Sequence, residues 1–228
     1  SRACPEPDQG YLMAKFPEPP DVDALKSIPP QTVNLKAGEK IFRVFRTEGP
    51  YPVSWNTFRY FGPTSSRFDH HLRNKVGQPG NGERGVLYGA IGPRAIPTCL
   101  AEFFQGTRKI NRKDGVPVLS AFALTAPLTL LDLRGSFATQ IGASMAINTG
   151  PRPRAQRWAQ RLYEAYPRSH GIIYPSSMHA NEPAITLWER STTFMPRHPL
   201  VHRLLSDPAL KRVILETADA IGYPVIDP

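Results

Sequence analysis

The clearest apolar pattern in the chain is a run of six residues, IFRVFR, at positions 41–46. Its alternation places Ile41, Arg43 and Phe45 on one face of a strand and the other three residues on the opposite face. Both faces are largely apolar, so the pattern predicts a strand that is buried on both sides. Shorter apolar runs predict further strands at residues 86–90, 116–124, 128–133, 171–175 and 184–189.

Three segments have the periodicity of helices. Residues 98–105 form a short apolar helix that carries a single carboxylate, Glu102. Residues 154–166 place arginines around one face and apolar side chains on the other, namely Ala155, Trp158, Ala159, Leu162 and Tyr166. A start signal at residues 206–208 and a stop at Gly222 predict a C-terminal helix. Its inward stripe is Leu210, Val213, Ile214, Thr217 and Ile221.

Strands and helices are interspersed without a regular alternation. This order favours an α+β fold with a mixed or antiparallel sheet core and flanking helices. Residues 1–40 contain seven prolines, which indicate an extended N-terminal segment with at most one helical turn, near residues 22–27. We expect residues 41–228 to form one domain that ends in the C-terminal helix. The glycine-rich residues 77–85 are interpreted as a flexible connection, because a phosphate-binding loop is followed by a helix.

The positive charge lies in the predicted domain. The formal net charge is +9, yet residues 1–40 hold five basic and six acidic residues, while residues 41–228 hold 23 and 13. Such a surface suits nucleic acid, a phosphate-bearing ligand or an acidic partner, although it is also compatible with a role in solubility alone.

The chain has no run of about 18 apolar residues, so we expect no transmembrane helix. Its N-terminal stretch lacks the apolar core of a signal peptide. The two cysteines, Cys4 and Cys99, form no disulfide or metal-binding pattern. We therefore expect a cytoplasmic protein that does not associate with a membrane.

The sequence lacks the residue patterns that several common kinds of site require. His198 and His202 have a spacing that can place two ligands on one helix face, but no third ligand accompanies them, and adjacent His70 and His71 point apart. We expect no metal site. The absence of GxSxG and SxxK motifs argues against a serine hydrolase. The arginines of residues 152–168 lack interleaved aromatic residues, so we interpret them as a solvated helix face and do not expect direct nucleic-acid binding.

The remaining candidates for chemistry are Arg43, Arg67, Tyr88 and Glu102, together with one or two serines. An arginine on a buried strand needs an anion, because an unpaired buried charge is costly. A bound ligand or an internal salt bridge would supply that anion. Tyr88 and Glu102 are lone polar residues on apolar elements, and their spacing alone leaves open a structural pair within the core.

Five short motifs resemble, in order and character, those of the RES domain family. They are IFRVFR, SSRFD, VLYGA, CLAEFF and YPSS, and they lie within residues 41–189. This family is the toxin half of a bacterial toxin–antitoxin system. The resemblance implies an ADP-ribosyltransferase-like fold and an enzyme that consumes NAD as its substrate, without a permanently bound cofactor. It also implies a cognate antitoxin, of Xre type, as a partner.

Carried over by motif, the resemblance implies three catalytic residues, Glu102, Arg43 and Tyr88. The NAD-binding residues that it implies are Arg43, Arg67, Tyr88, and a serine that is Ser136 in one family pattern and Ser176 in another. The chain has Ser65-Ser66-Arg67-Phe68-Asp69 where the commoner family form is Gly-Gly-Arg-Trp-Asn. This departure bears on the subfamily, and hence on the acceptor of the ADP-ribose group.

The chemistry of NAD cleavage gives these residues a physical role. Breaking the nicotinamide–ribose bond builds positive charge on the ribose, which a carboxylate in an apolar wall, such as Glu102, stabilises. Guanidinium groups suit the pyrophosphate, and Tyr88 offers a flat face and a hydroxyl. We predict NAD cleavage by hydrolysis or phosphorolysis. The alternatives are protein ADP-ribosylation at the same site, and a non-catalytic module that binds nucleotide or nucleic acid.

Overall fold

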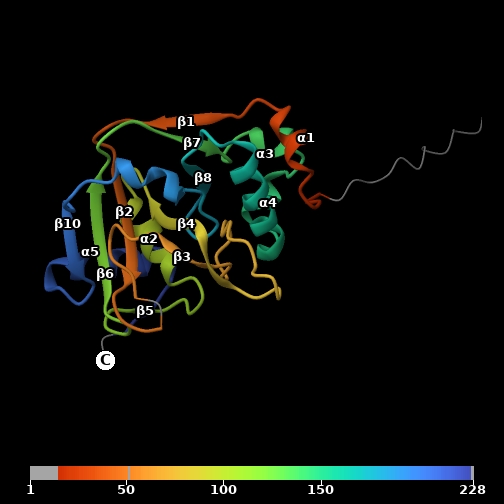
Figure 1. Ribbon diagram of the computed structural model, residues 1–228. Helices are drawn as coiled ribbons and strands as arrows, with labels where there is room; N and C mark the ends of the chain where they lie inside the picture. Colours follow the sequence, from red (N-terminus) through yellow and green to blue (C-terminus); the bar gives the residue numbers. More distant parts are fainter. Residues whose placement is uncertain (1–14, 51, 227–228) are drawn as a thin grey trace, which may run out of the picture.

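The fold is a curled mixed sheet with helices packed on one of its faces (Figure 1). The structure is a computed structural model that describes residues 15–50 and 52–226. Nine strands of this described part form the main sheet, in the order β1-β7-β8-β9-β4-β2-β6-β10, with β3 paired to β4. Strands β7 and β8 are parallel, and the other neighbours are antiparallel. The predicted α+β class with a mixed sheet is therefore confirmed.

The main sheet consists of β1 (Thr32–Leu35), β2 (Lys40–Arg46), β3 (Arg59–Gly62), β4 (Gly80–Ala90), β6 (Pro117–Ala123), β7 (Leu128–Asp132), β8 (Gly171–Pro175), β9 (Pro183–Trp188) and β10 (Val201–Leu204). A small parallel pair joins β5 (Ile110–Asn111) to β11 (Val225–Ile226). The α-helices are α1 (Val22–Lys26), α2 (Ala95–Phe103), α3 (Phe137–Gln140), α4 (Arg152–Ala165) and α5 (Lys211–Ile221). Three short 3-10 helices are Met145–Asn148, Glu189–Phe194 and Pro208–Leu210.

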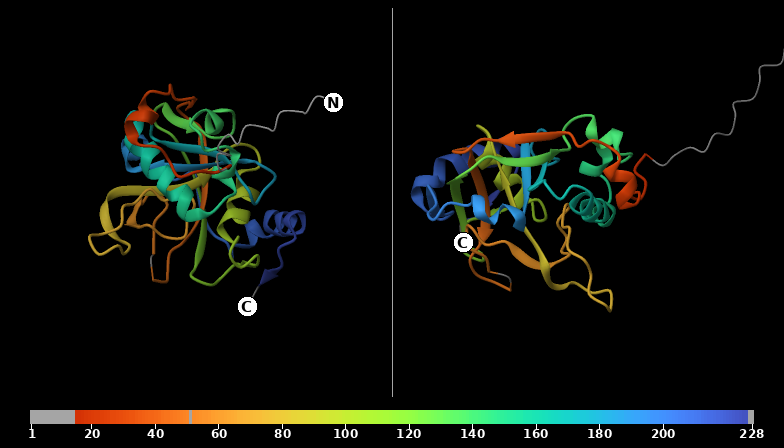
Figure 2. Two further views of the ribbon diagram at one scale, coloured as in Figure 1. Left: turned by 90° about the vertical axis from the view of Figure 1, so that its right-hand side faces the viewer. Right: turned by 45° about the horizontal axis from the view of Figure 1, so that its top comes forward.

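Alternation along the strands divides the core into two sides. One face of the sheet buries a cluster of its own side chains, including Ile41, Phe45, Leu87 and Ile185. The other face is covered by helices, with α1, α3 and α4 at one end and α2 and α5 at the other (Figures 1 and 2). The strands between the two groups of helices carry the site described below.

The sheet splits where β2 meets β4. These two strands pair at one position, Phe42 opposite Ala90, and part beyond it. A Cβ atom at Gly89 would lie 2.7 Å from the carbonyl oxygen of Phe42 and 2.9 Å from Cγ2 of Ile41. The close approach of the two strands therefore requires a glycine at position 89.

Five of the six predicted strands are confirmed to within one residue at each end, and the sixth, β4, begins six residues before its predicted start. Five strands of the described part escaped prediction: β1, β3, β5, β10 and β11. Residues 77–85, interpreted as a flexible connection, contain the start of β4, which pairs with the unpredicted β3. Both β1 and β10 lie at edges of the sheet, where mixed exposure blurs the alternation. His202 belongs to β10, so the helical spacing considered for His198 and His202 does not apply.

The predicted helices are also confirmed, with shifted ends. Helix α2 begins at Ala95, three residues before the predicted start, and α4 begins at Arg152 instead of residue 154. The predicted apolar stripe of α4 is buried throughout. At the C-terminal helix, Asp207 accepts a hydrogen bond from the N–H of Ala209, a 3-10 turn follows, and Gly222 ends α5 in the left-handed conformation.

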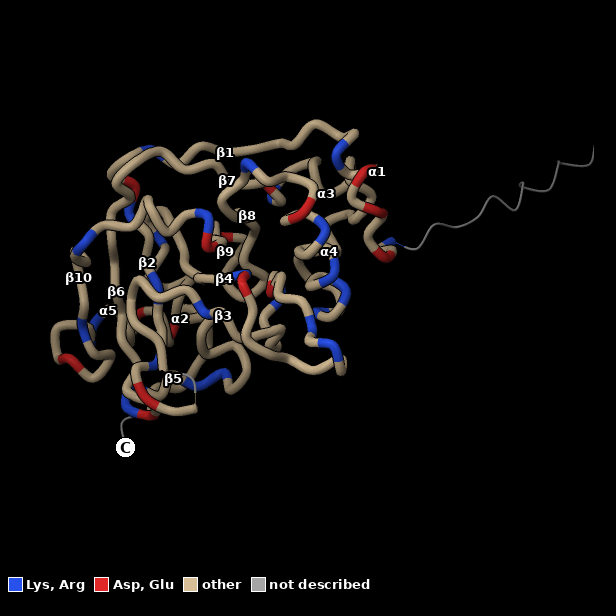
Figure 3. Tube along the Cα trace, in the orientation of Figure 1, with Lys and Arg blue, Asp and Glu red and all other residues tan. Residues whose placement is uncertain are grey.

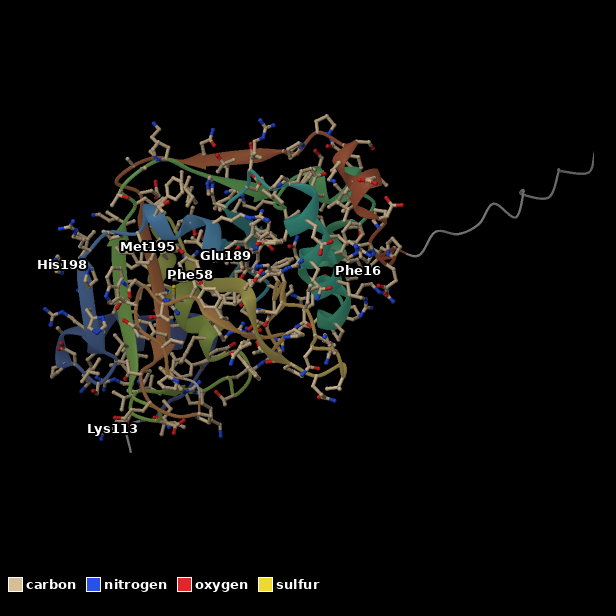
Figure 4. The ribbon with its side chains drawn as sticks, viewed as in Figure 1. Phe16, Phe58, Lys113, Glu189, Met195 and His198 are labelled. Carbon is tan, nitrogen blue, oxygen red and sulfur yellow. The ribbon has the colours of Figure 1, made fainter. Side chains whose placement is uncertain are left out.

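The described part of the N-terminal segment packs on α4, where Phe16 lies beside the helix (Figure 4). The Tyr166 hydroxyl donates to the carbonyl oxygen of Leu25 at 2.8 Å. Glu18 pairs with Arg154 at 3.0 Å and with Arg157 at 2.6 Å. Basic positions recur along α4 in Figure 3, and these two pairs neutralise part of that face. Residues 1–14 of the predicted segment lie outside the described residues.

Two further findings concern the described residues alone. None of their helices has the length and apolar character needed to cross a membrane. They also contain no group of three or more His, Cys, Asp or Glu side chains placed to hold a metal ion.

The packing of α1 generates a testable prediction. Leu25 is fully buried in the cluster beneath α4, so Leu25→Ala should lower the free energy of unfolding by about 2–5 kcal/mol. The exposed neighbour Lys26 provides the control, since Lys26→Ala should change it by less than about 0.5 kcal/mol. Urea unfolding measures both. Equal, small effects would show that α1 is not part of the folded core.

Candidate active site

The split between β2 and β4 opens into a cavity of about 570 Å³. Its walls come from both strands, from β8, from the two helices α2 and α4, and from the loop around residue 66. The charged residues that line it are Arg43, Arg46, Arg59, Arg67, Arg152, Glu48 and Glu102. This excess of arginine favours an anionic ligand.

Glu102, near the end of α2, places its carboxylate in this cavity. Its Oε1 accepts a hydrogen bond from the Ser176 hydroxyl at 2.6 Å, and its Oε2 faces the amide nitrogen of Gln105 at 3.3 Å. Burial raises the pKa of Glu102, while the hydrogen bond from Ser176 and the charge of Arg67 oppose that rise. Both carboxylate oxygens are thus held in place by neighbouring side chains.

Ser176 is held in turn by the loop that joins β8 to β9. Its oxygen accepts hydrogen bonds from the N–H groups of Met178 at 3.2 Å and His179 at 3.1 Å, which leaves its proton for Glu102. The Nδ1 atom of His179 contacts the Thr98 hydroxyl on α2 at 2.9 Å. Since Thr98 lies one turn before Glu102, this contact sets the position of the serine relative to the carboxylate.

Arg43 lies at the split and is 7% exposed. Its Nη1 donates to the carbonyl oxygens of Ser54 at 3.3 Å, Trp55 at 3.0 Å and Thr57 at 3.5 Å, and its guanidinium lies 4.9 Å from the centre of the Phe45 ring. Burial lowers its pKa to about 10, so it stays charged at neutral pH. Within residues 15–50 and 52–226 no carboxylate pairs with it, so the internal salt bridge considered from the sequence is not formed there.

Arg67 comes from the loop between β3 and β4. Its Nη1 donates to the carbonyl oxygen of Gly150 at 2.5 Å. Gln156 on α4 holds the same loop by donating to two of its carbonyl oxygens, at 2.6 and 2.8 Å. Burial lowers the pKa of Arg67, and the neighbouring charge of Arg152 lowers it further. Two guanidinium groups therefore lie close enough to repel each other at the cavity.

The loop that carries Arg67 is anchored by a buried carboxylate, Asp69. It accepts hydrogen bonds from the Arg59 guanidinium at 2.9 Å and from the N–H and hydroxyl of Thr64 at 2.7 and 2.9 Å, and it contacts the His71 ring. Burial alone would raise the pKa of Asp69, but the hydrogen bond with His71, the charge of Arg59 and the Thr64 N–H hold it well below its usual range. The carboxylate thus fixes the loop from behind.

Two tyrosines supply aromatic surface to the cavity. They are Tyr88 on β4 and Tyr174 on β8, and burial raises the pKa of both. The hydroxyl of Tyr88 is buried without a hydrogen-bond partner among the residues that the structure describes. Such a hydroxyl normally finds a partner, so its place in the cavity wall suits a ligand that supplies one.

Comparison with known proteins gives this site a family. The family model of the RES domain matches residues 40–206, which is more than half of the length of this chain. The chain belongs to the RES domain family. The fold of this RES domain is similar to that in the crystal structure of the M. tuberculosis MbcT–MbcA toxin–antitoxin complex, with a TM-score of 0.51, 13% sequence identity, and coverage of 84% of this chain and 94% of that chain. No curated protein sequence matches the chain.

The RES domain brings five of the six predicted site residues together. Four line the cavity and one is hydrogen-bonded to its carboxylate: Arg43, Arg67, Tyr88, Glu102 and Ser176. The exception is Ser136, which is exposed at the start of α3 and hydrogen-bonded to Gln31 at 3.2 Å. Ser176 is therefore the serine that the fold places at the cavity, while the roles of all these residues stay predictions.

Among the cavity residues that escaped the sequence analysis are three that act on Glu102 or on which it acts. Gln105 follows Glu102 by three residues, a spacing that brings side chains together at a helix end and could have revealed it. Tyr174 lies within the quoted motif YPSS, two residues before Ser176. Arg152 was assigned to a solvated helix face, and no local pattern separates it from the other arginines of α4.

The buried carboxylate of Asp69 leads to a prediction about the stability of the protein in acid. Asp69→Asn should lower the free energy of unfolding at pH 7 by about 3–5 kcal/mol, because Arg59 and His71 lose the group that compensates them. The folded state depresses the pKa of Asp69, so the contribution is complete above the ordinary value of about 4 and is lost progressively as the pH falls from there through the lower pKa of the folded state. Urea unfolding should show a smaller difference in the free energy of unfolding between the two proteins at pH 3 than at pH 7.

Asp132 serves as the matched control, because its ion pair with Arg134 is partly exposed to solvent, whereas Asp69 is fully buried. Asp132→Asn should change the free energy of unfolding by less than about 1 kcal/mol. A gap between wild type and Asp69→Asn that stays constant from pH 7 to pH 3 would contradict the proposed role of the charge.

Proposed function

We propose that this RES domain cleaves the nicotinamide–ribose bond of NAD, by hydrolysis or phosphorolysis. The observation that carries the proposal is the carboxylate of Glu102, held by Ser176 at 2.6 Å in a cavity whose charged lining residues are mostly arginines. The RES family membership and the likeness to a toxin–antitoxin complex support it. The cytoplasm, where NAD is abundant, is the expected place of action.

The proposed mechanism is electrostatic. As the bond to nicotinamide breaks, positive charge develops on the ribose, and the ionised Glu102 stabilises it in a partly dehydrated wall. Ser176 holds one carboxylate oxygen, so the carboxylate needs little reorganisation when the charge appears. Because burial raises the pKa of Glu102, cleavage should decline in acid at a higher pH than the ordinary glutamate value of about 4.3.

The remaining groups suit the rest of the dinucleotide. The pyrophosphate would lie against Arg67 and Arg43, of which Arg43 is a buried cation without a carboxylate partner in the described chain. Tyr88 and Tyr174 offer ring faces for nicotinamide or adenine, and the Tyr88 hydroxyl offers a hydrogen bond.

Incubation of the purified protein with NAD tests the proposal against its rivals. Free nicotinamide with ADP-ribose, or with its phosphorylated form when phosphate is supplied, supports cleavage by hydrolysis or phosphorolysis. Nicotinamide together with ADP-ribose bound covalently to protein supports the alternative, protein ADP-ribosylation. If NAD remains intact and merely binds, the chain is a non-catalytic binding module and the proposal is wrong.

We also propose that the protein is toxic alone and is restrained by a cognate antitoxin, of Xre type. An enzyme that drains NAD from its own cytoplasm requires restraint, and the similar fold in the MbcT–MbcA complex belongs to a toxin–antitoxin pair. The arginines of the cavity predict acidic groups on the segment that blocks it. An antitoxin that binds Arg43→Ala and Arg67→Ala variants as tightly as wild type would contradict insertion into the cavity.

Substitution of the carboxylate is the first prediction from this function. Glu102→Gln is nearly isosteric, so the protein should fold normally, while NAD cleavage should fall by about 10²–10³-fold because the stabilising charge is lost. The same variant should no longer arrest growth when expressed alone. Nicotinamide release and a thermal melt measure the two properties. A folded variant with wild-type turnover would remove Glu102 from the mechanism.

The second prediction separates binding from catalysis. In a Glu102→Gln background, which prevents turnover, Arg67→Met should weaken NAD binding by about 10- to 100-fold, as expected for a lost charge-assisted hydrogen bond. The exposed Arg161 on α4, paired with Glu164, provides the control, and Arg161→Met should leave the Kd unchanged. Calorimetric titration with NAD measures both. Equal affinities for the two variants would exclude Arg67 from the binding site.

A further inference from the structure

A second side chain, besides Ser176, holds the carboxylate of Glu102. Gln105 lies just after the C-cap of α2, and its Nε2 is 2.8 Å from the carbonyl oxygen and 3.3 Å from Oε2 of Glu102. Its Oε1 accepts a hydrogen bond from Nη2 of Arg152, at the start of α4, at 2.6 Å. A continuous chain of hydrogen bonds thus connects α4 to the carboxylate.

The amide of Gln105 fits this place in one orientation. Its nitrogen faces two acceptors of Glu102, and its oxygen faces a guanidinium that only donates. The reversed amide would place its oxygen against two acceptors and its NH₂ group against a donor. Arg152 therefore selects the orientation in which Gln105 donates to the carboxylate.

We propose that Gln105 is a positioning residue for Glu102, and that Arg152 acts through Gln105 by holding its amide in the donating orientation. This inference deepens the proposed function and rests on it. Ser176 fixes Oε1 from the β8–β9 loop, and Gln105 fixes Oε2 from the other side. The carboxylate is then aimed by Ser176 from the β8–β9 loop and by Gln105 from the end of α2, and Arg152 at the start of α4 holds Gln105.

The pKa of Glu102 reports on the chain of hydrogen bonds from Arg152 through Gln105 to Glu102, which is called the bridge below. Five titratable or charged groups of the described chain interact electrostatically with Glu102. They are Arg67 in the loop before β4, Cys99 on α2, Arg152 on α4, Tyr174 on β8 and Tyr223 after α5. Burial raises the pKa of Glu102, and the hydrogen bonds from Ser176 and Gln105 lower it, as do the charges of Arg67 and Arg152. Loss of the Gln105 donor should therefore raise this pKa.

The variant Gln105→Met keeps the length of the side chain and removes its two hydrogen bonds to Glu102 and the one that it accepts from Arg152. We expect the acid limb of kcat/KM for NAD to move to higher pH by about half to one unit, the equivalent of one hydrogen bond to a carboxylate. We also expect kcat on the plateau to fall by about tenfold. Arg152→Met should shift the limb in the same direction. The double variant should shift it by less than the sum, because the two residues act in one chain.

Two matched controls lie outside the cavity. Gln140 on α3 accepts from Gln31, and Arg161 on α4 pairs with Glu164. Gln140→Met and Arg161→Met should leave the pH profile and kcat unchanged. If Gln105→Met behaves like Gln140→Met, or if the double variant shows the full sum of the single shifts, the bridge is not formed as proposed.

A spectroscopic titration makes the test independent of turnover. The ¹³C signal of the Glu102 carboxyl, assigned by its loss in Glu102→Gln, gives the pKa directly. The bridge predicts a higher pKa in folded Gln105→Met than in wild type, and an unchanged pKa overturns it. If wild type does not cleave NAD, the proposed function fails, while this titration still decides whether Gln105 and Arg152 control the carboxylate.

Discussion

The cavity exists because β2 and β4 touch at one position and then part. The contact at Phe42 and Ala90 requires Gly89, since a Cβ atom there would collide with the carbonyl oxygen of Phe42. Beyond it, the strand edges no longer pair with each other, and Arg43 fills part of the gap by donating to carbonyl oxygens of residues 54–57. One glycine and one buried arginine thus turn an otherwise continuous sheet into the wall of a cavity.

The electrostatics of the site follow from this split. Cations from four parts of the chain meet in a cavity of about 570 Å³, and Glu102 faces them from the end of α2. A buried carboxylate tends to take up a proton, and here Ser176, Arg67, Arg152 and Gln105 oppose that tendency. The arrangement suits a substrate whose anionic pyrophosphate lies beside a sugar that becomes positively charged as its bond breaks.

The sequence predicts the central strands, the long helices and most of the candidate site, because buried elements show clear periodicity and the five motifs occur in order. Edge strands such as β1 and β10, and the exposed start of β4, lack that signal. The two candidate serines could not be separated, because only the fold shows Ser176 at Glu102 and Ser136 at the surface. Arg152 was missed for a similar reason: its contact with Gln105 depends on where α4 begins relative to α2.

The most direct test of this account is a crystal structure of the Glu102→Gln variant with NAD bound. The account predicts that the dinucleotide occupies the split between β2 and β4, with the ribose that carries nicotinamide beside residue 102 and the pyrophosphate against Arg67 and Arg43. Binding of NAD elsewhere on the molecule, or in this cavity with that ribose away from residue 102, would contradict it.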